Sequence, residues 1–274
     1  IWLDRQQAKL LPVDYFMATC TLPYELRFLA WDNQTLVYNL LFACASSTLK
    51  DFGLNPKNLG ADIGITAVLH THNRRLDYHP HVHVVVPGGG VDKAKKQWKK
   101  KGAKYLFNEF ALARVFRARF LKAWTKAGLS LPTAVPRKWV VDCTYTGKGL
   151  SALKYLSRYL YRGVIGEKSI VTNQDGKITF KYIEGRTGET LHRTLNGHDF
   201  LWLVLQHVLP KGFRRVRDYG FLHGNAKKLL SLVQWVLQVL IQACTPRPRP
   251  AFLCPACQAP MKILGFAQPP WSSP

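Results

Sequence analysis

Histidines alternate with other residues in the segment Leu76-Asp-Tyr-His-Pro-His-Val-His-Val-Val-Val86. In an extended strand alternate side chains face the same side, so His79, His81 and His83 share one face. Val82, Val84 and Val86 share the other face, where they can pack against helices. The pattern therefore predicts a strand with a row of imidazoles on one side and core residues on the other.

A second pair of histidines precedes this strand. The segment from Ile63 to His72 is also typical of a strand, and a polar link from Asn73 to Asp77 joins the two, which predicts a β-hairpin. If the turn is centred on this link, His70 lies roughly opposite His81 or Pro80. Three imidazoles can then converge on one ion.

Five histidines fall within fourteen residues, from His70 to His83, on an apolar hairpin. Neutral imidazole is the commonest side-chain metal ligand. Three protein ligands leave coordination positions open for substrate oxygens. The pattern favours a metal site over a surface cluster that binds ions by chance. Ligand type alone makes zinc the default ion and gives no preference for magnesium.

The rest of the chain alternates strand-like and helical segments, with hairpin signals such as the Asp175-Gly176 turn. This order predicts an α+β fold with a central, mainly antiparallel sheet and flanking helices. The stretch from Phe213 to Phe221 fits either strand or loop. The expected strands are Tyr15 to Leu22, Lys138 to Thr146, Ile170 to Asn173, Lys177 to Glu184 and Glu189 to Thr194, and the expected helices are Asn33 to Phe52, Asn108 to Ala127, Leu150 to Arg162, His198 to Val208 and Asn225 to Ala243.

The chain carries 39 lysines and arginines against 16 acidic residues, a net charge of +23. A polyanionic partner is expected, because each phosphate that a cation neutralises releases counterions. Charge alone separates neither enzymes from binding proteins nor DNA from RNA. Candidate backbone contacts are Arg114 and Arg117, on the helix that begins at Asn108, and Lys99 and Lys100, in the lysine-rich stretch from Lys93 to Lys104.

Cysteine usage and hydropathy indicate a cytoplasmic protein. Cys20, Cys44 and Cys143 lie in apolar or strand-like surroundings, which is typical of reduced, buried thiols. The apolar stretch from Leu229 to Ala243 is interrupted by glutamines and is too short to span a membrane. No secretory signal is visible.

A tyrosine-rich helix is expected at Lys154-Tyr-Leu-Ser-Arg-Tyr-Leu-Tyr-Arg162. Tyr155 and Tyr159 are four residues apart and share a helix face, while Arg158 and Arg162 each follow a tyrosine by three residues. Each phenol thus has a guanidinium within reach of the same phosphate, and Lys154 adds a further cation. A phenol, with a pKa of about 10, becomes a useful nucleophile when a metal polarises the phosphate.

Tyrosines at this spacing are more often packing residues. The helix indicates a catalytic role only in combination with the histidine hairpin. Together, the two motifs resemble the HUH endonucleases with two catalytic tyrosines, and more closely the rolling-circle transposases of the insertion-sequence-ninety-one class. The resemblance spans about Leu69 to Leu222. It rests on Leu69-His-Thr71, His79-Pro-His-Val-His83, Val86-Pro-Gly-Gly-Gly90, Arg114-Val-Phe-Arg117 with Phe120-Leu121, Lys154-Tyr-Leu-Ser-Arg-Tyr159 and His207-Val-Leu-Pro-Lys-Gly-Phe-Arg-Arg-Val-Arg-Asp-Tyr-Gly220.

The resemblance implies that His81 and His83 bind a divalent metal on the open face of the sheet. A third ligand is expected from the neighbouring strand or from the motif itself. Strand geometry indicates His70 first and His79 second. The family favours Mg²⁺ or Mn²⁺, and zinc remains compatible with the ligands.

The resemblance also implies that Tyr155 and Tyr159 are the nucleophiles. The expected activity is cleavage and rejoining of single-stranded DNA through a 5′-phosphotyrosine during rolling-circle transposition in bacteria. The expected partner is DNA, as single-stranded or hairpin element ends near the nucleoid. No membrane or small-molecule partner is expected, and the oligomeric state is left open.

Three regions are expected: residues 1–165 as the catalytic domain, 166–244 as the C-terminal part of the core, and 245–274 as a proline-rich linker and tail. Family members usually carry an N-terminal cysteine-rich zinc region. Nothing similar precedes Asp14, so we expect a truncated copy. Cys254 and Cys257 form half of a zinc ribbon, and we do not expect them to bind metal alone.

Three alternatives stay open. A plasmid relaxase or replication initiator would share the chemistry, and a helicase motif would favour it, but the sequence has no phosphate-binding GK[ST] loop. A non-enzymatic, zinc-stabilised nucleic-acid-binding protein would hold one zinc ion without cleaving. A tyrosine recombinase ranks last, because the histidine strand has no role in that reaction.

Overall fold

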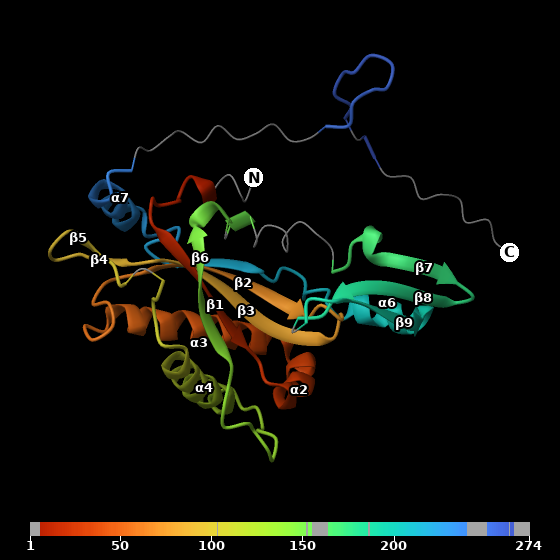
Figure 1. Cartoon of the computed structure of the whole chain (residues 1–274), viewed down its shortest axis with the longest axis horizontal. Coiled ribbons are helices and arrows are strands. Elements are labelled where there is room, and N and C mark those ends of the chain that lie inside the picture. The colour runs from red at the N-terminus through yellow and green to blue at the C-terminus, as the bar shows by residue number, and fades with distance from the viewer. Residues whose placement is uncertain are drawn as a thin grey trace.

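A computed structural model describes residues 6–102, 104–151, 153–154, 164–185, 187–239, 251–262 and 264–265. At its centre lies an antiparallel five-stranded sheet in the order β10-β2-β3-β1-β6, which confirms the predicted fold class (Figure 1). The strands are β1 (Asp14–Thr21), β2 (Gly64–His72), β3 (Tyr78–Pro87), β6 (Val141–Lys148) and β10 (Val216–Gly220).

Helices cover one face of this sheet (Figure 1). The long helices are α3 (Gln34–Leu54) and α4 (Glu109–Lys126), and the short η1 (Tyr24–Leu26) and α2 (Arg27–Asp32) follow β1. The Asn108 side chain caps α4 by accepting a hydrogen bond from Ala111 N, as its position before the helix predicts.

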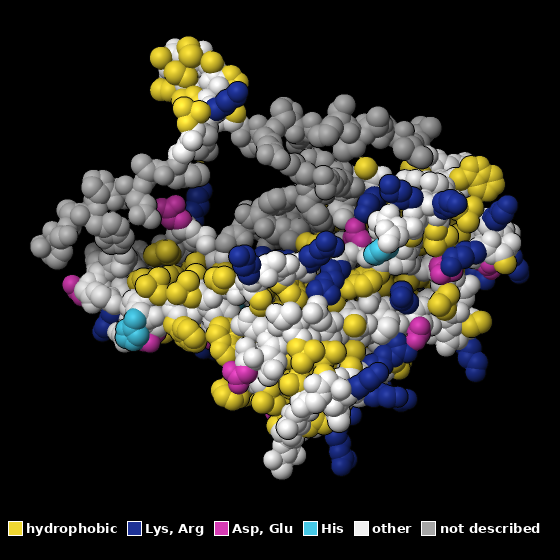
Figure 2. All heavy atoms as spheres, turned by 180° about the vertical axis from the view of Figure 1, so that it is seen from behind, with side chains coloured by type: hydrophobic (Ala, Val, Ile, Leu, Met, Phe, Trp, Pro, Cys, Tyr) yellow, Lys and Arg dark blue, Asp and Glu magenta, His cyan; other side chains and the backbone are white. Residues whose placement is uncertain are grey.

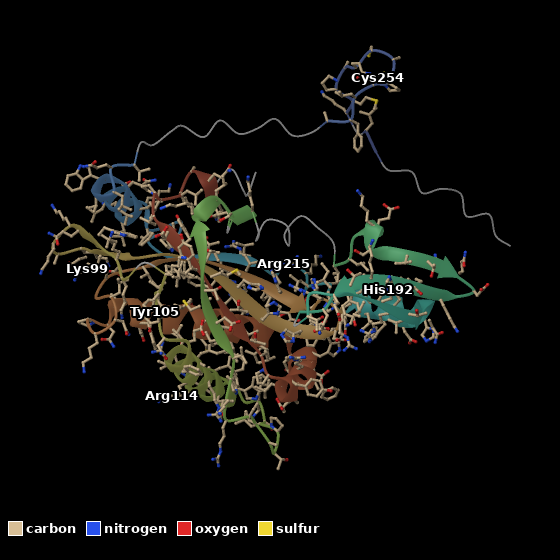
Figure 3. The ribbon with its side chains drawn as sticks, viewed as in Figure 1. Lys99, Tyr105, Arg114, His192, Arg215 and Cys254 are labelled. Carbon is tan, nitrogen blue, oxygen red and sulfur yellow. The ribbon has the colours of Figure 1, made fainter. Side chains whose placement is uncertain are left out.

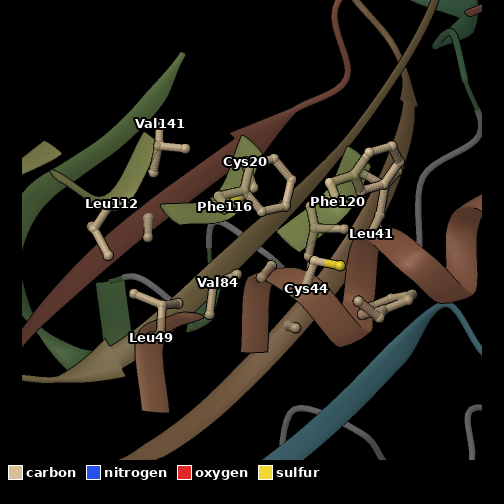
Figure 4. Packing of buried hydrophobic residues seen from close by; sticks show 14 of the residues in the cluster. Cys20, Leu41, Cys44, Leu49, Val84, Leu112, Phe116, Phe120 and Val141 are labelled. Atoms are coloured by element: carbon tan, nitrogen blue, oxygen red, sulfur yellow. The ribbon is translucent and has the colours of Figure 1, made fainter. Parts of the chain in front are cut away.

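The main core lies between these helices and the sheet. Val84 of β3 packs in one cluster with Leu41 of α3 and with Phe116 and Phe120 of α4, all fully buried (Figure 4). Each such side chain contributes about 1.5–3 kcal/mol of transfer free energy on burial. Because the alternate side chains of a strand point to opposite faces, this packing directs the β3 histidines to the other side of the sheet.

A smaller sheet adjoins the β2–β3 turn. It consists of β7 (Ile170–Gln174), β8 (Lys177–Ile183) and β9 (Thr190–Asn196), and α6 (Gly197–Leu205) packs on it. Leu76, in the β2–β3 turn, is buried with Phe180 and Phe200 of this unit. Arg193 of β9 forms an ion pair with Asp77 at 2.8 Å. The unit is thereby fixed to the histidine hairpin.

The other end of the central sheet carries a second hairpin, β4 (Gly90–Asp92) and β5 (Gln97–Lys99), close to α7 (Lys227–Val236) (Figure 1). The lysine-rich stretch from Lys93 to Lys104 thus contains β5. A short η2 (Glu167–Ser169) precedes β7. No described helix has the length and apolar character needed to cross a membrane.

Three predicted boundaries are wrong. The helix expected to reach Val208 ends at Leu205. The last helix was expected to reach Ala243, but α7 ends at Val236. Gln238 has a φ of 52°, a left-handed conformation that terminates helices. The strand expected from Lys138 begins only at Val141, where pairing with β1 starts. Cys20 and Cys44 are buried free thiols and Cys143 is a half-buried one, so the predicted reduced state matches their surroundings.

We expect Phe116→Ala to lower the free energy of unfolding by about 3–5 kcal/mol, because it leaves a cavity at a fully buried position of α4. Urea denaturation followed by circular dichroism measures this loss. Phe110→Ala, on the same helix but 82% exposed, is the matched control and should change stability little. Equal effects of the two substitutions would contradict the assigned face of α4.

Candidate metal centre

Three histidines from the two central strands converge on the sheet face opposite α3 and α4. His70 of β2 lies directly opposite His81 of β3, as the hairpin predicts. The ring centroids are separated by 5.1 Å for His70–His81, 4.4 Å for His70–His83 and 4.8 Å for His81–His83. One nitrogen from each ring lies within 4.8 Å of the others, and no other set of three metal-binding side chains meets this criterion among the described residues.

The separation of two of these nitrogens fits a shared ion. His81 Nε2 and His83 Nε2 are 3.2 Å apart. For an ion at typical metal–imidazole distances, about 2.0–2.1 Å, from both atoms, the nitrogen–metal–nitrogen angle would be about 100°. That angle lies between octahedral and tetrahedral values, so both coordination types can be completed by His70 and by oxygens from outside.

Hydrogen bonds to the opposite ring nitrogens orient two of the histidines. His81 Nδ1 lies 2.6 Å from His79 O, and because a carbonyl only accepts, Nδ1–H is the donor. The neutral ring therefore carries its lone pair on Nε2. His83 Nδ1 shares a hydrogen bond of 3.0 Å with Thr19 Oγ1 of β1. Partners of this kind orient metal-ligating imidazoles and set their tautomers.

Burial keeps the three rings neutral. Loss of solvation lowers the pKa of His81 to about 4 and that of His83 to about 3, and it lowers the pKa of His70 well below its usual value. The charges of neighbouring rings add to the effect for His70 and His83. Near neutral pH the lone pairs are therefore available for a metal.

His79, the alternative third ligand, is not part of this triad. Its ring centroid lies 5.2 Å from that of His81, and its carbonyl is what positions His81. His72, two residues after His70, packs instead against His207, with 5.1 Å between ring centroids. The triad of His70, His81 and His83 is thus the group whose ligand atoms converge.

The triad opens into a cleft of about 640 Å³ between the central sheet and the end of β8. Asp142 of β6 lines it, in register with Thr19, and burial together with Glu109 raises the pKa of its carboxyl group. Asp142 and Thr19 lie beside the triad because β1 pairs with β3 and β6, outside the hairpin. The sequence analysis did not predict that pairing and so missed both residues. The full lining is His70, His72, Asn73, Arg74, Arg75, Leu76, His79, His81, His83, Asp142, Val164, Tyr182, Ile183, Glu184 and Gly185.

The predicted DNA contacts on α4 lie on the other side of the sheet. Arg114 is exposed on the helix layer (Figure 3), and Arg117 donates from Nε to Pro136 O at 3.0 Å. Lys99 lies at the far end of the molecule, where it pairs with Asp92 at 2.8 Å. The structure therefore does not bring these residues to the triad.

Lys100 lines a separate cavity of about 730 Å³, together with Lys101 and Lys148. On the surface seen from behind, basic side chains outnumber acidic ones (Figure 2). Lys154 is described, but the predicted nucleophiles Tyr155 and Tyr159, with Arg158 and Arg162, lie outside the described residues.

Known proteins similar to this chain are transposases. A family described as "Putative transposase" matches residues 64–229, which include the whole triad. "Putative transposase y4qJ" of Sinorhizobium fredii is 35% identical over 256 residues, covering 85% of this chain and 64% of that protein. "Transposase for insertion sequence element IS801" of Pseudomonas savastanoi pv. phaseolicola is 28% identical over 288 residues, covering 97% and 67%. The chain thus spans about two thirds of their length, and no solved structure matches it.

We expect Thr19→Val to weaken divalent-metal binding roughly 10- to 100-fold, because His83 loses the hydroxyl that orients it. Thr19→Ser keeps the hydroxyl and should retain most of the affinity. Isothermal titration calorimetry with Mn²⁺ and Zn²⁺ measures both. His192→Ala, at an exposed histidine of β9, is the control that should leave affinity unchanged (Figure 3). Equal affinity of the valine and serine variants would contradict this role of Thr19.

The metal-free protein should lose stability as the pH falls. The pKa values of His81 and His83 are about 4 and about 3 in the folded protein, against about 6.5 in an unfolded chain. Below about pH 6.5 the unfolded state binds more protons, so the free energy of unfolding falls until the pH reaches the folded-state values.

Urea denaturation at about pH 7 and about pH 5 measures this effect. We expect His81→Gln combined with His83→Gln to reduce the loss between these pH values by on the order of 4 kcal/mol, about 2 kcal/mol for each histidine. An equally steep loss in the variant would show that other groups dominate.

Proposed function

Because the chain belongs to the transposase family that matches residues 64–229, we propose that it is a metal-dependent endonuclease and strand transferase acting on single-stranded DNA. Its reaction would be rolling-circle transposition of a bacterial mobile element. The expected substrates are single-stranded or hairpin element ends, bound in the cytoplasm near the nucleoid. The strongly basic composition, with a net charge of +23, suits such a partner.

The observation that carries the proposal is the triad of His70, His81 and His83. Three neutral imidazoles converge beside an open cleft. A divalent ion held there would polarise a phosphoryl oxygen and stabilise the charge that develops on it. The protein's part is to fix the ligand geometry, through Thr19 and the His79 carbonyl, and to present the phosphate.

We assign the nucleophile to Tyr155 or Tyr159. The phenol oxygen forms a bond to phosphorus, the bond from phosphorus to the 3′ oxygen breaks, and that oxygen leaves with the electron pair and takes up a proton. The phenol gives up its own proton. The products are a 5′-phosphotyrosine and a free 3′ hydroxyl, and because the phosphodiester energy is retained, the second tyrosine or a hydroxyl can rejoin the strand. Arg158 and Arg162 follow the tyrosines at helical spacing and would contact the same phosphate.

We propose Mg²⁺ or Mn²⁺ as the working ion, with phosphate and water oxygens completing its coordination. A ligand set made only of imidazoles also suits zinc. That property supports the second candidate function, a zinc-stabilised nucleic-acid-binding protein without cleavage activity. The two functions differ in one outcome, the formation of a covalent protein–DNA adduct.

The test is covalent capture of a labelled single-stranded oligonucleotide from an element end, read as a shifted band on a denaturing gel. We expect an adduct with Mn²⁺ or Mg²⁺, none with chelator, and none for Tyr155→Phe combined with Tyr159→Phe. Tyr105→Phe, at an exposed tyrosine far from the cleft, is the control and should keep the adduct (Figure 3).

An adduct formed by the double variant would refute the tyrosine assignment. A wild-type protein that holds one zinc ion tightly and forms no adduct with any of these ions would support the non-enzymatic alternative.

A further inference from the structure

Two partly buried arginines stand on either side of the histidine triad. Arg215 immediately precedes β10, and Arg27 opens α2, just after β1. The sheet order β10-β2-β3-β1 places the two triad strands between these positions. Neither arginine belongs to the DNA contacts expected from the sequence.

Arg215 is fixed beside the first triad residue. Its Nε–H donates to Leu69 O at 3.1 Å, and Leu69 N–H donates to Arg215 O at 3.0 Å. Leu69 directly precedes His70. The Arg215 charge also contributes to the lowered pKa values of His70, His72 and His207, in keeping with a guanidinium on the histidine side.

Arg27 occupies the corresponding position on the other flank. Its Nε–H donates to Leu22 O at 3.5 Å, and Leu22 N–H donates to Pro80 O at 3.0 Å, next to His81. Its guanidinium carbon lies 5.5 Å from the centroid of the Tyr24 ring. The Arg27 charge contributes to the lowered pKa values of His79 and His81.

Both charges lack an anionic partner in the part of the chain that the structure describes. No carboxylate lies within 4.0 Å of either guanidinium there. Asp77 and Glu25 act on Arg27 through space, beyond ion-pair distance, and Asp77 is already paired with Arg193 at 2.8 Å and Arg75 at 3.7 Å. Burial lowers the pKa of both arginines. A partly buried cation without a counter-ion is costly, so an anion from outside is expected to complete each site.

The two arginines that line the cleft, Arg74 and Arg75, behave differently from Arg27 and Arg215, which flank the triad strands outside that lining. Arg75 pairs with Asp77, and Arg74 donates from Nη1 to Ile183 O at 3.4 Å. The Arg74 side chain thereby links the β2–β3 turn to the smaller sheet, while the Arg75 side chain pairs within the turn. Their existing partners make them poorer candidates for an external anion.

We propose that Arg27 and Arg215 form a phosphate clamp. These two phosphate-binding residues would hold the DNA strand on both sides of the scissile phosphate. The strand would cross the sheet from β10 to β1, over the triad. Three strand spacings separate β10 from β1, about 14 Å, a length that spans several phosphates of one DNA strand. A guanidinium anchored through Nε keeps its terminal N–H groups for phosphate oxygens. The inference rests on the proposed function for the identity of the polyanion.

The test is equilibrium binding of a labelled single-stranded oligonucleotide in chelator, followed by fluorescence anisotropy over a series of salt concentrations. Each phosphate contact contributes about 0.7 to the slope of log K against log salt for a single strand. We expect Arg27→Gln and Arg215→Gln each to reduce the magnitude of that negative slope by about 0.7, and the double variant to reduce it by about 1.4. Arg27→Lys and Arg215→Lys should retain most of it.

Arg137→Gln is the matched control, because Arg137 is exposed in the loop between α4 and β6. It should leave the slope unchanged, and thermal melting should show that the glutamine variants remain folded. An unchanged slope in the folded double variant, or an equal loss in Arg137→Gln, would overturn the clamp. If the lysine variants lose as much as the glutamine variants, charge contact with phosphate is refuted.

The covalent adduct assay, run in parallel, separates the two proposals. A wild-type protein that forms the adduct while the double variant binds normally refutes the clamp alone. A wild-type protein that neither binds single strands nor forms an adduct refutes both.

Discussion

The register that pairs His70 with His81 across β2 and β3 determines which side chains face the cleft and which face the helices. Side chains alternate along a strand, so a slip of one residue would turn the imidazoles into the helix layer and the valines into the cleft. The buried contacts of Val84 with the cluster that includes Phe116 and Phe120 oppose that slip. The same packing that stabilises the core therefore orients the triad, and a core defect that shifts β3 would also misplace the ligands.

Burial has a second consequence for the site. It removes water from His70, His81 and His83 and so lowers their pKa values, which leaves three lone pairs in one place. The His81 and His83 Nε2 atoms lie 3.2 Å apart, with a partly buried arginine on each flank of the triad. A divalent ion and phosphate oxygens together would satisfy both kinds of group. The proposed function and the proposed clamp are thus complementary accounts of one electrostatic arrangement.

Local patterns predicted much of this fold. Alternation predicted the histidine face, the polar link predicted the hairpin and the position of His70, and Asn108 marked the start of α4. Contacts between segments far apart in sequence were not predictable. Thr19 reaches His83 only because β1 pairs with β3, and Arg27 and Arg215 flank the triad only because of the strand order. The basic residues chosen from local charge density, such as Arg114 and Lys99, lie elsewhere for the same reason. The roles of Tyr155 and Tyr159 stay predictions.

The central claim is that the triad holds one divalent ion through imidazole nitrogen. Electron spin-echo spectroscopy of the protein loaded with Mn²⁺ tests it most directly, because nitrogen nuclei bound to manganese modulate the echo. The account predicts one ion per chain with coupling to imidazole nitrogen, and weakened binding with diminished coupling in His70→Ala. Binding without nitrogen coupling, or coupling unchanged by His70→Ala, would contradict it.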